Sequence, residues 1–300
     1  MSQDRNLPQD SQPEQRELVN TRNPPRPPFE NTRDTRFYFA SAGHAEALSR
    51  LLFLARDRNM GIGLLTGEIG AGKTLLRTLL YAQLAADQHV RVNIENSLLD
   101  FDGLLLEILS QMQGERLHPA DYPDRYSRLA AFKRLLSEQI VTRARHLIVL
   151  IDEAQQLDLA TIEGLKALTN IASERQNFMT LILIGQPELR ERLKQLPQVE
   201  QRVSLRFHLT ALGTAETGDY VMHRLRAAGY VGEQPLDAEA LQLLHRASRG
   251  MPREINRLCK LALDHIVTHE VSRFDVDAIA VVVEDLRRHG GLHDVINDAL

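Results

Sequence analysis

The chain contains a glycine-rich loop whose residue types are suited to binding phosphate. Residues 67–74 read GEIGAGKT, which fits G-x-x-x-x-G-K-[ST], and they lie between a short apolar run and a helical pattern. Glycines let the backbone curl and aim its N–H groups at phosphate oxygens, while a lysine adds a mobile positive charge and a hydroxyl can bind Mg²⁺. We therefore predict nucleotide contacts from the following loop residues: Gly67, Gly70, Ala71, Gly72, Lys73, Thr74 and Leu75.

Two acidic residues follow a second apolar run. Residues 147–157 read LIVLIDEAQQL, a predicted strand that ends at Asp152 and Glu153. Because the carboxyl ends of parallel strands meet at one edge of a sheet, we expect both carboxylates to lie beside the phosphate loop. There Asp152 would hold Mg²⁺ together with Thr74, and Glu153 would orient and polarise the attacking water. The pattern predicts an Mg²⁺-dependent ATPase that binds ATP.

Further polar residues extend this predicted site. Gln186 follows an apolar run in LILIGQPEL, where its side chain can position the water beside Glu153. Arg202 and Arg206 lie before and within QRVSLRFHL, and one of them is expected to reach a neighbouring subunit's γ-phosphate as an arginine finger. We favour Arg202 because it precedes the strand, but the choice stays open. Arg253, in GMPR, begins a helix after a glycine stop, so we expect it to point toward the nucleotide.

The elements that must position these residues alternate between two patterns. Apolar runs predict strands, and amphipathic segments between them predict helices, which together indicate an α/β fold with a five-stranded parallel sheet covered on both faces. The expected strands are 62–66, 90–94, 147–151, 179–184 and 203–209. The helices expected between and before them are 41–58, 73–86, 101–112, 126–143, 159–172 and 188–196. Ser41 is the expected N-cap of the first helix.

Domain boundaries follow from changes in these patterns. Residues 1–36 are rich in proline and poor in apolar residues, which predicts a disordered arm. Residues 37–212 form the predicted nucleotide-binding domain. Residues 213–289 show only helical patterns, at 214–227, 238–248, 252–269 and 275–288, and Asp237 and Asp275 are expected helix caps. This all-helical lid is followed by a tail, 290–300.

Composition limits the class of protein. The chain is 43% hydrophobic and 25% charged, the balance of a soluble globular protein. It has no apolar run long enough for a membrane span, no apolar leader segment and a single cysteine, Cys259. These features predict a cytoplasmic protein. A net charge of −4 excludes a polycation that binds nucleic acid over its whole surface.

The two motifs together with a helical C-terminal unit favour an AAA+ ATPase over a small GTPase, since no guanine-reading N-K-x-D motif is present. The sequence also resembles a narrower family. FYFASAGHAEALSRLL, GEIGAGKT, IDEAQQL, LILIGQPEL, QRVSLRFHL and GMPREINRLC occur in the order typical of ExeA/GspA-type (MshM-like) AAA+ ATPases of secretion and pilus systems. The resemblance covers about residues 28–288 and implies an oligomeric ring, strand order 5-1-4-3-2 and proximity of residues 39–44 to the adenine.

In this family a transmembrane helix and a peptidoglycan-binding region follow the ATPase, and neither pattern follows the lid here. We therefore expect an ATP-driven assembly factor for a secretion, pilus or envelope complex that reaches the inner membrane through a partner, or a free-standing regulator. The alternative is a DNA-binding AAA+ adaptor of the TnsC/MuB transposition type. A slight excess of Arg and Lys over Asp and Glu in residues 201–260 is the feature that motivates it. A third hypothesis is a nucleotide switch without turnover. Glu153 argues against it, because its predicted role is to orient the attacking water.

Overall fold

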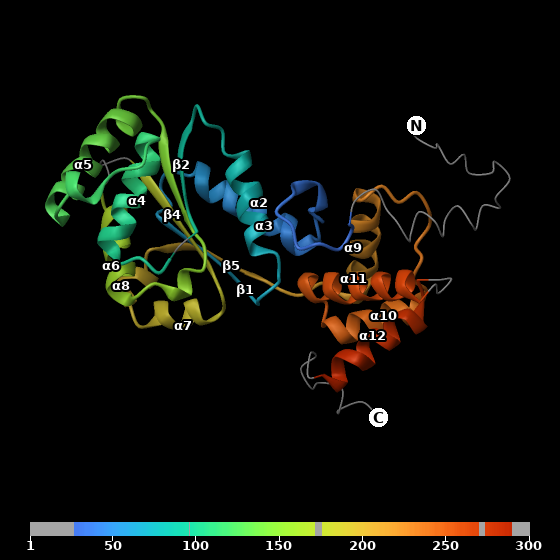
Figure 1. Ribbon diagram of the computed structural model, residues 1–300. Coiled ribbons are helices and arrows are strands. Elements are labelled where there is room, and N and C mark those ends of the chain that lie inside the picture. The colour runs from blue at the N-terminus through green and yellow to red at the C-terminus, as the bar shows by residue number, and fades with distance from the viewer. Residues whose placement is uncertain (1–26, 96, 172–175, 270–273, 290–300) are drawn as a thin grey trace, which may run out of the picture. The chain divides into compact units, whose positions relative to one another are not determined.

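The computed structural model describes residues 27–95, 97–171, 176–269 and 274–289. These residues divide into two compact units (Figure 1). Residues 40–210 form one, called here the α/β unit. The described residues before Ala40 join those after Thr210 in the other, called here the helical unit. Every helix within the described ranges is too short or too polar to cross a bilayer.

The α/β unit is built on a parallel sheet whose strand order is β2-β3-β4-β1-β5. The strands are β1 Ile62–Gly67, β2 His89–Ile94, β3 His146–Ile151, β4 Met179–Gly185 and β5 Val203–Leu209. The predicted fold class and the strand order implied by the family resemblance are both confirmed. Because β1, β3 and β4 lie inside the sheet, every one of their residues is buried, whereas the edge strand β5 is buried only at Val203 and Leu209.

Helices cover both faces of this sheet. One face carries α2 and α3, and the other carries α4 and α6 (Figure 1). The bounds of all helices in this unit are α2 Ala42–Arg56, α3 Lys73–Gln83, α4 Phe101–Gln113, α5 Arg125–Leu135, α6 Leu159–Thr169, α7 Glu188–Lys194 and α8 Pro197–Glu200, with short turns η2 Pro119–Asp121 and η4 Ala154–Gln156. Ser41 caps α2, since its hydroxyl accepts a hydrogen bond from the His44 amide at 3.3 Å.

One predicted helix differs from the structure. The pattern over residues 126–143 predicts a single α-helix, but α5 ends at Leu135 and continues as a π-helix, η3, over Leu136–Val141. The Thr142 amide bonds to the Ser137 carbonyl, an i to i−5 pairing that widens the turn. Periodicity cannot separate the two forms because the change in pitch lasts for little more than one turn.

The helical unit contains α9 Thr214–Ala227, α10 Ala238–Ser248, α11 Pro252–Thr268 and α12 Val276–Arg288. The predicted caps are confirmed, because Asp237 accepts from the Ala240 amide at 2.8 Å and Asp275 from the Ala278 amide at 3.2 Å. The turn between α10 and α11 places Gly250 at φ 68°, where a Cβ would lie 2.1 Å from the Leu212 carbonyl oxygen. A glycine is therefore required at this turn.

The predicted arm of residues 1–36 is too long. Residues 1–26 lie outside the described residues, but residues 27–39, which include the turn η1 (Thr35–Phe37), pack on the helical unit. Phe29 is 3% exposed within that unit's hydrophobic core. The buried Arg224 holds the backbone beside it, with its Nε donating to the Pro28 carbonyl at 2.6 Å and its guanidinium 4.4 Å from the Phe37 ring. The helical unit therefore takes residues from both ends of the described chain.

Candidate functional site

The glycine-rich loop of residues 67–74, called here the phosphate-type loop, connects the end of β1 to the start of α3. Gly70 and Gly72 adopt φ of 87° and 97°, which residues with a side chain rarely adopt. Gly67 allows a close approach, because a Cβ there would lie 2.9 Å from the Leu209 carbonyl oxygen of β5. The loop therefore curls as the sequence motif predicts.

The lysine of this loop is held inside it. Lys73 is 6% exposed, and its ammonium group donates to the carbonyls of Gly67 at 2.6 Å and Glu68 at 2.9 Å. Ala71 is buried and its amide bonds back to the Glu68 carbonyl at 3.2 Å, while Leu75 lies in the first turn of α3. The positive charge is thus tethered to the backbone of the segment predicted to bind phosphate.

His44 supports the loop from α2. Its Nε2 lies 2.9 Å from the Ala71 carbonyl and its Nδ1 lies 2.7 Å from the Ser41 hydroxyl. A carbonyl only accepts, so Nε2 carries a proton, and in the neutral ring Nδ1 accepts from the Ser41 hydroxyl. A Cβ at Gly72 would lie 2.8 Å from this Nε2, so the loop and the imidazole fit closely. The family resemblance points to residues 39–44 only as neighbours of the adenine, so this contact was not predicted.

The carboxylate at the end of β3 reaches the phosphate-type loop, as the strand arrangement predicts. Asp152 is 5% exposed and its Oδ2 accepts from the Thr74 hydroxyl at 3.2 Å. A hydroxyl and a carboxylate are hard oxygen ligands of the kind that Mg²⁺ prefers, and Mg²⁺ commonly takes its remaining ligands from water and substrate phosphates. These two residues fit the ion. Within the described ranges, no group of three or more His, Cys, Asp or Glu is arranged to hold a metal by itself.

A buried arginine that sequence reasoning missed pairs with the carboxylate of this site. Arg77, on α3, is 2% exposed, and its guanidinium contacts Asp152 at 3.3 Å and Glu95 at 2.7 Å. A buried guanidinium requires paired charges, and these two carboxylates come from the ends of neighbouring strands. An Arg within the otherwise apolar inward face of a helix was the available sequence signal.

Glu153 adopts an uncommon backbone conformation. Its φ of 51° and ψ of 35° lie in the left-handed region, which costs a residue with a side chain about 1–2 kcal/mol. Its amide donates to the Asp152 Oδ1 at 3.0 Å, and its carbonyl accepts from the buried Ser97 hydroxyl at 2.9 Å. Strained backbone of this kind clusters at functional sites.

Gln155 connects Glu153 to the end of β4. Its side-chain Nε2 donates to the Glu153 carboxylate at 2.6 Å, and its Oε1 accepts from the Gln186 backbone amide at 3.1 Å. Gln186 therefore lies beside the residue that holds Glu153, which is the neighbourhood that the sequence predicts for it. Sequence reasoning assigned no role to Gln155, although it lies within the IDEAQQL motif.

The three arginines considered for the site lie in different places. Arg202 is exposed between α8 and β5, and no residue in the described part of the chain forms an ion pair with its guanidinium. Arg206, on β5, donates to the Glu200 carbonyl at 2.9 Å and lies 3.7 Å from the Glu200 carboxylate. Arg253 is exposed in the first turn of α11 in the helical unit, so its role at the nucleotide stays a prediction.

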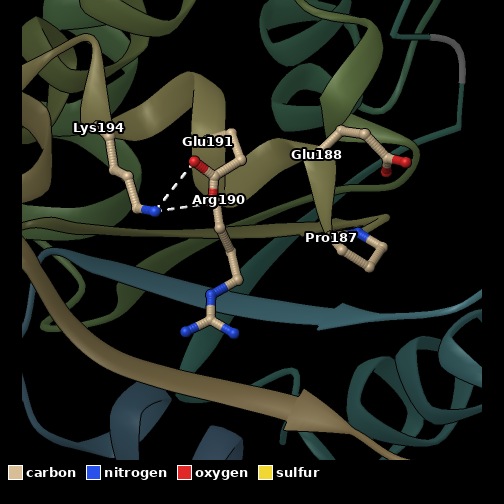
Figure 2. A pocket seen from close by; sticks show the side chains of 5 residues that line it. All are labelled: Pro187, Glu188, Arg190, Glu191 and Lys194. Carbon is tan, nitrogen blue, oxygen red and sulfur yellow. Dashed lines mark hydrogen bonds and ion pairs between the residues drawn. The ribbon is translucent and has the colours of Figure 1, made fainter.

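A shallow groove of about 430 Å³ lies on α7, directly after Gln186. Its lining is Pro187, Glu188, Arg190, Glu191 and Lys194 (Figure 2). Lys194 donates to both Glu191 carboxylate oxygens at 2.7 and 2.9 Å, so part of its charge is already compensated. We do not assign this mixed-charge groove to the nucleotide.

Comparison with known proteins agrees with this geometry. Residues 56–193 match the family model described as an AAA domain. General secretion pathway protein A of Aeromonas hydrophila is 34% identical over 273 residues, which cover 88% of this chain and 48% of the relative. The chain thus spans about half the length of this curated relative.

Solved structures share the fold. The Aeropyrum pernix ORC2 protein, solved in ADPNP–ADP complexes, superposes with a TM-score of 0.64 at 17% identity and covers 87% of this chain and 71% of its own. Cdc6p from Pyrobaculum aerophilum gives 0.59 at 17% identity over 80% and 67% of the two chains. The Thermotoga maritima RuvB branch migration motor gives 0.54 at 20% identity over 80% and 69%. The secretion relative and the AAA domain match support the ExeA/GspA-type AAA family as the family of this chain, and the solved structures, all under 25% identical, show the fold alone.

Proposed function

We propose that the chain binds ATP with Mg²⁺ and hydrolyses it between the phosphate-type loop and the acidic end of β3. The observation that carries the proposal is the 3.2 Å contact between Thr74 and Asp152, which joins two motifs far apart in sequence. Glu153 follows directly, with its backbone anchored at both its amide and its carbonyl. A P-loop ATPase needs these groups at one place.

Each residue then has a chemical role. Lys73 exchanges its two carbonyl contacts for phosphate oxygens, and the loop amides donate to the same anion. Thr74 and Asp152 would hold Mg²⁺, which would neutralise charge on the phosphate oxygens. Glu153 accepts a hydrogen bond from the attacking water and orients it, while Gln186 positions the water from the end of β4.

A neighbouring copy of the chain supplies Arg202 as the arginine finger. Its exposure and lack of an ion pair with any described residue support this role, because a finger must be available to the next subunit. Arg206 is held by Glu200 and is the weaker candidate. The proposed active form is therefore an oligomeric ring or filament. The role of Arg253 at a nucleotide remains a prediction from the GMPR sequence.

The hydrolysis proposal is tested by phosphate release from purified full-length chain, with and without Mg²⁺. Wild type should turn over ATP only when Mg²⁺ is present. Glu153→Gln should retain ATP affinity and lose turnover, because the amide cannot accept a proton. Turnover at the wild-type rate in Glu153→Gln would show that another group orients the water.

The proposed cellular role is assembly or remodelling of a secretion, pilus or envelope complex. Its support is the relative named as a general secretion pathway protein, 34% identical over most of this chain. The ORC2 and RuvB structures are under 25% identical and support the fold alone. Binding to the inner membrane through a partner protein is part of the same proposal.

Two binding experiments separate the two cellular roles. A tagged Glu153→Gln chain, held with ATP, should recover an inner-membrane protein of a secretion or pilus locus, and Lys73→Ala should not. Duplex DNA should show no ATP-dependent shift at low salt. An ATP-dependent shift that weakens steeply with salt would instead favour the DNA-binding adaptor, because phosphate contacts release counterions.

A further inference from the structure

Gln155 joins two parts of the proposed site through a single side chain. Its amide group contacts Glu153, the proposed base, at one end and the backbone of Gln186, at the end of β4, at the other. Both contacts are within hydrogen-bond distance, at 2.6 Å and 3.1 Å. The two residues that are proposed to orient the water are thus linked to each other.

The orientation of this amide is fixed by its neighbours. A backbone N–H only donates, so the Gln155 oxygen must face Gln186. The ionised Glu153 carboxylate only accepts, so the Gln155 NH₂ group must face it. Rotating the amide by 180° would break both contacts, which means that the side chain has one stable arrangement.

The end of β4 is shaped around this amide. A Cβ added at Gly185 would lie 2.6 Å from the Gln155 Oε1 and 3.3 Å from the Gln155 backbone nitrogen. Gly185 is buried, and its φ is not in the left-handed region, so backbone conformation does not explain a glycine there. Close approach of the Gln155 side chain, whose Oε1 is the nearest atom, explains it, together with the Leu189 Cδ2 at 3.0 Å.

The rest of Glu153 is already fixed. Its amide and carbonyl are held by Asp152 and Ser97, which leaves the flexible side chain as the part that can still move. Three rotatable bonds separate that backbone from the carboxylate. A positioned base must be held within about 0.5 Å of its productive geometry.

We propose that Gln155 is a positioning residue for hydrolysis, which holds the Glu153 carboxylate in register with Gln186 at the end of β4. This role rests on the proposed hydrolysis at Glu153. Among the described residues, Gln155 forms no side-chain hydrogen bond with the phosphate-type loop, so we expect its contribution to concern the rate of the reaction and to leave nucleotide affinity unchanged. Misplacing a reacting group by about 1 Å can lower a rate by about 100-fold.

The test measures kcat, nucleotide affinity and melting temperature for Gln155→Ala and Gln155→Asn in the full-length chain. We expect kcat to fall by about 10- to 100-fold in both. Asn retains the amide but is one methylene too short to reach both partners. Affinity for a fluorescent ATP analogue should stay within about 2-fold of wild type. Gln195→Ala, the same change at an exposed position in this unit, is the matched control and should keep wild-type kcat.

Gly185→Ala provides an independent second variant. Its added methyl should displace the Gln155 amide and lower kcat to a similar degree. The nearest atom to the added methyl is the Gln155 Oε1, and the next is the flexible end of Leu189. If the methyl acts through Gln155, the double variant Gly185→Ala/Gln155→Ala should be no slower than the slower single variant, within about 2-fold. A multiplicative loss would show that the two positions act separately and would overturn the proposal.

The remaining outcomes are also decisive. Gln155 variants with wild-type kcat, with or without a lower melting temperature, would reduce the residue to a structural role. A higher basal kcat would show that Gln155 restrains Glu153 instead of positioning it. Absence of turnover in wild type itself would refute the proposed hydrolysis, and the positioning role would fall with it.

Discussion

Replacing Phe29 by alanine should destabilise the helical unit, although this residue lies in a proline-rich stretch without helix or strand pattern. Phe29 is 3% exposed and packs in the hydrophobic core of that unit. The chain beside it is held by Arg224 at the Pro28 carbonyl, by a 2.6 Å ion pair between Glu30 and Lys260, and by a 3.1 Å hydrogen bond from Asn256 to Asn31. A truncated side chain therefore leaves a cavity that the fixed backbone cannot easily close.

The magnitude follows from this burial. An aromatic side chain buries about 150–250 Å², which corresponds to roughly 4–6 kcal/mol at about 25 cal/mol per Å². Alanine retains the Cβ contribution, and measured Phe→Ala changes in cores are about 3–5 kcal/mol. With a urea m value of roughly 1.5 kcal/mol/M, the midpoint of the helical unit should fall by about 2–3 M.

The assay must follow the two units separately, because they need not unfold together. Hydrogen exchange of peptides from α9 to α12, followed across a urea series, reports the helical unit, and peptides from β1, β3 and β4 report the α/β unit. Phe53→Ala, at a 57% exposed position on α2, is the control and should change stability by less than about 1 kcal/mol. An unchanged midpoint for α9 to α12 in Phe29→Ala would refute the packing of residues 27–39 on this unit.

Three further changes test other parts of the structure. In a fluorescent-nucleotide titration, Lys73→Ala should weaken ATP binding by about 10- to 100-fold, because one charge-assisted hydrogen-bonding group is lost. Unchanged affinity would contradict the role of Lys73. Arg202→Ala should lower turnover by about 10³-fold, at least about 10-fold more than Arg206→Ala, and mixing it with Glu153→Gln should restore activity; absence of rescue would argue against a finger acting in trans. Burial, then nearby charge, lowers the pKa of His146 to about 4. The unfolded chain therefore binds a proton that the folded chain rejects, and stability should decline by up to about 3 kcal/mol as pH falls from about 6.5 to 4. In a plot of the urea midpoint against pH, His146→Gln should lower the slope between about pH 4 and 6.5. An identical slope in wild type and His146→Gln would refute the assignment of this pH dependence to His146.

Local patterns were sufficient to predict most of the architecture. Each strand is a short apolar run between turn signals, and the caps Ser41, Asp237 and Asp275 are the residue types that satisfy free helix amides. The phosphate-type loop and the carboxylates after β3 were predictable because their motifs include the flanking strand. Parallel strands then bring the two motifs to the same edge of the sheet.

The contacts that sequence reasoning missed join residues that are far apart along the chain or carry no motif. His44 supports the loop across 27 residues, and Ser97 reaches Glu153 across 56. In the sequence Arg77 is only one helix-forming residue among others, because its partners Asp152 and Glu95 lie at the ends of other strands. Phe29 was missed because one buried aromatic residue has no period, and the surrounding prolines dominate the local composition.

The most direct test of the account is the fate of ATP bound to the full-length chain under single-turnover conditions with Mg²⁺. The nucleotide is recovered and identified at successive times for wild type and for Glu153→Gln. We predict that wild type converts bound ATP to ADP and phosphate, while Glu153→Gln binds ATP equally well and retains it unchanged. Equal conversion by both proteins would contradict the central claim that hydrolysis takes place where β3 ends beside the phosphate-type loop.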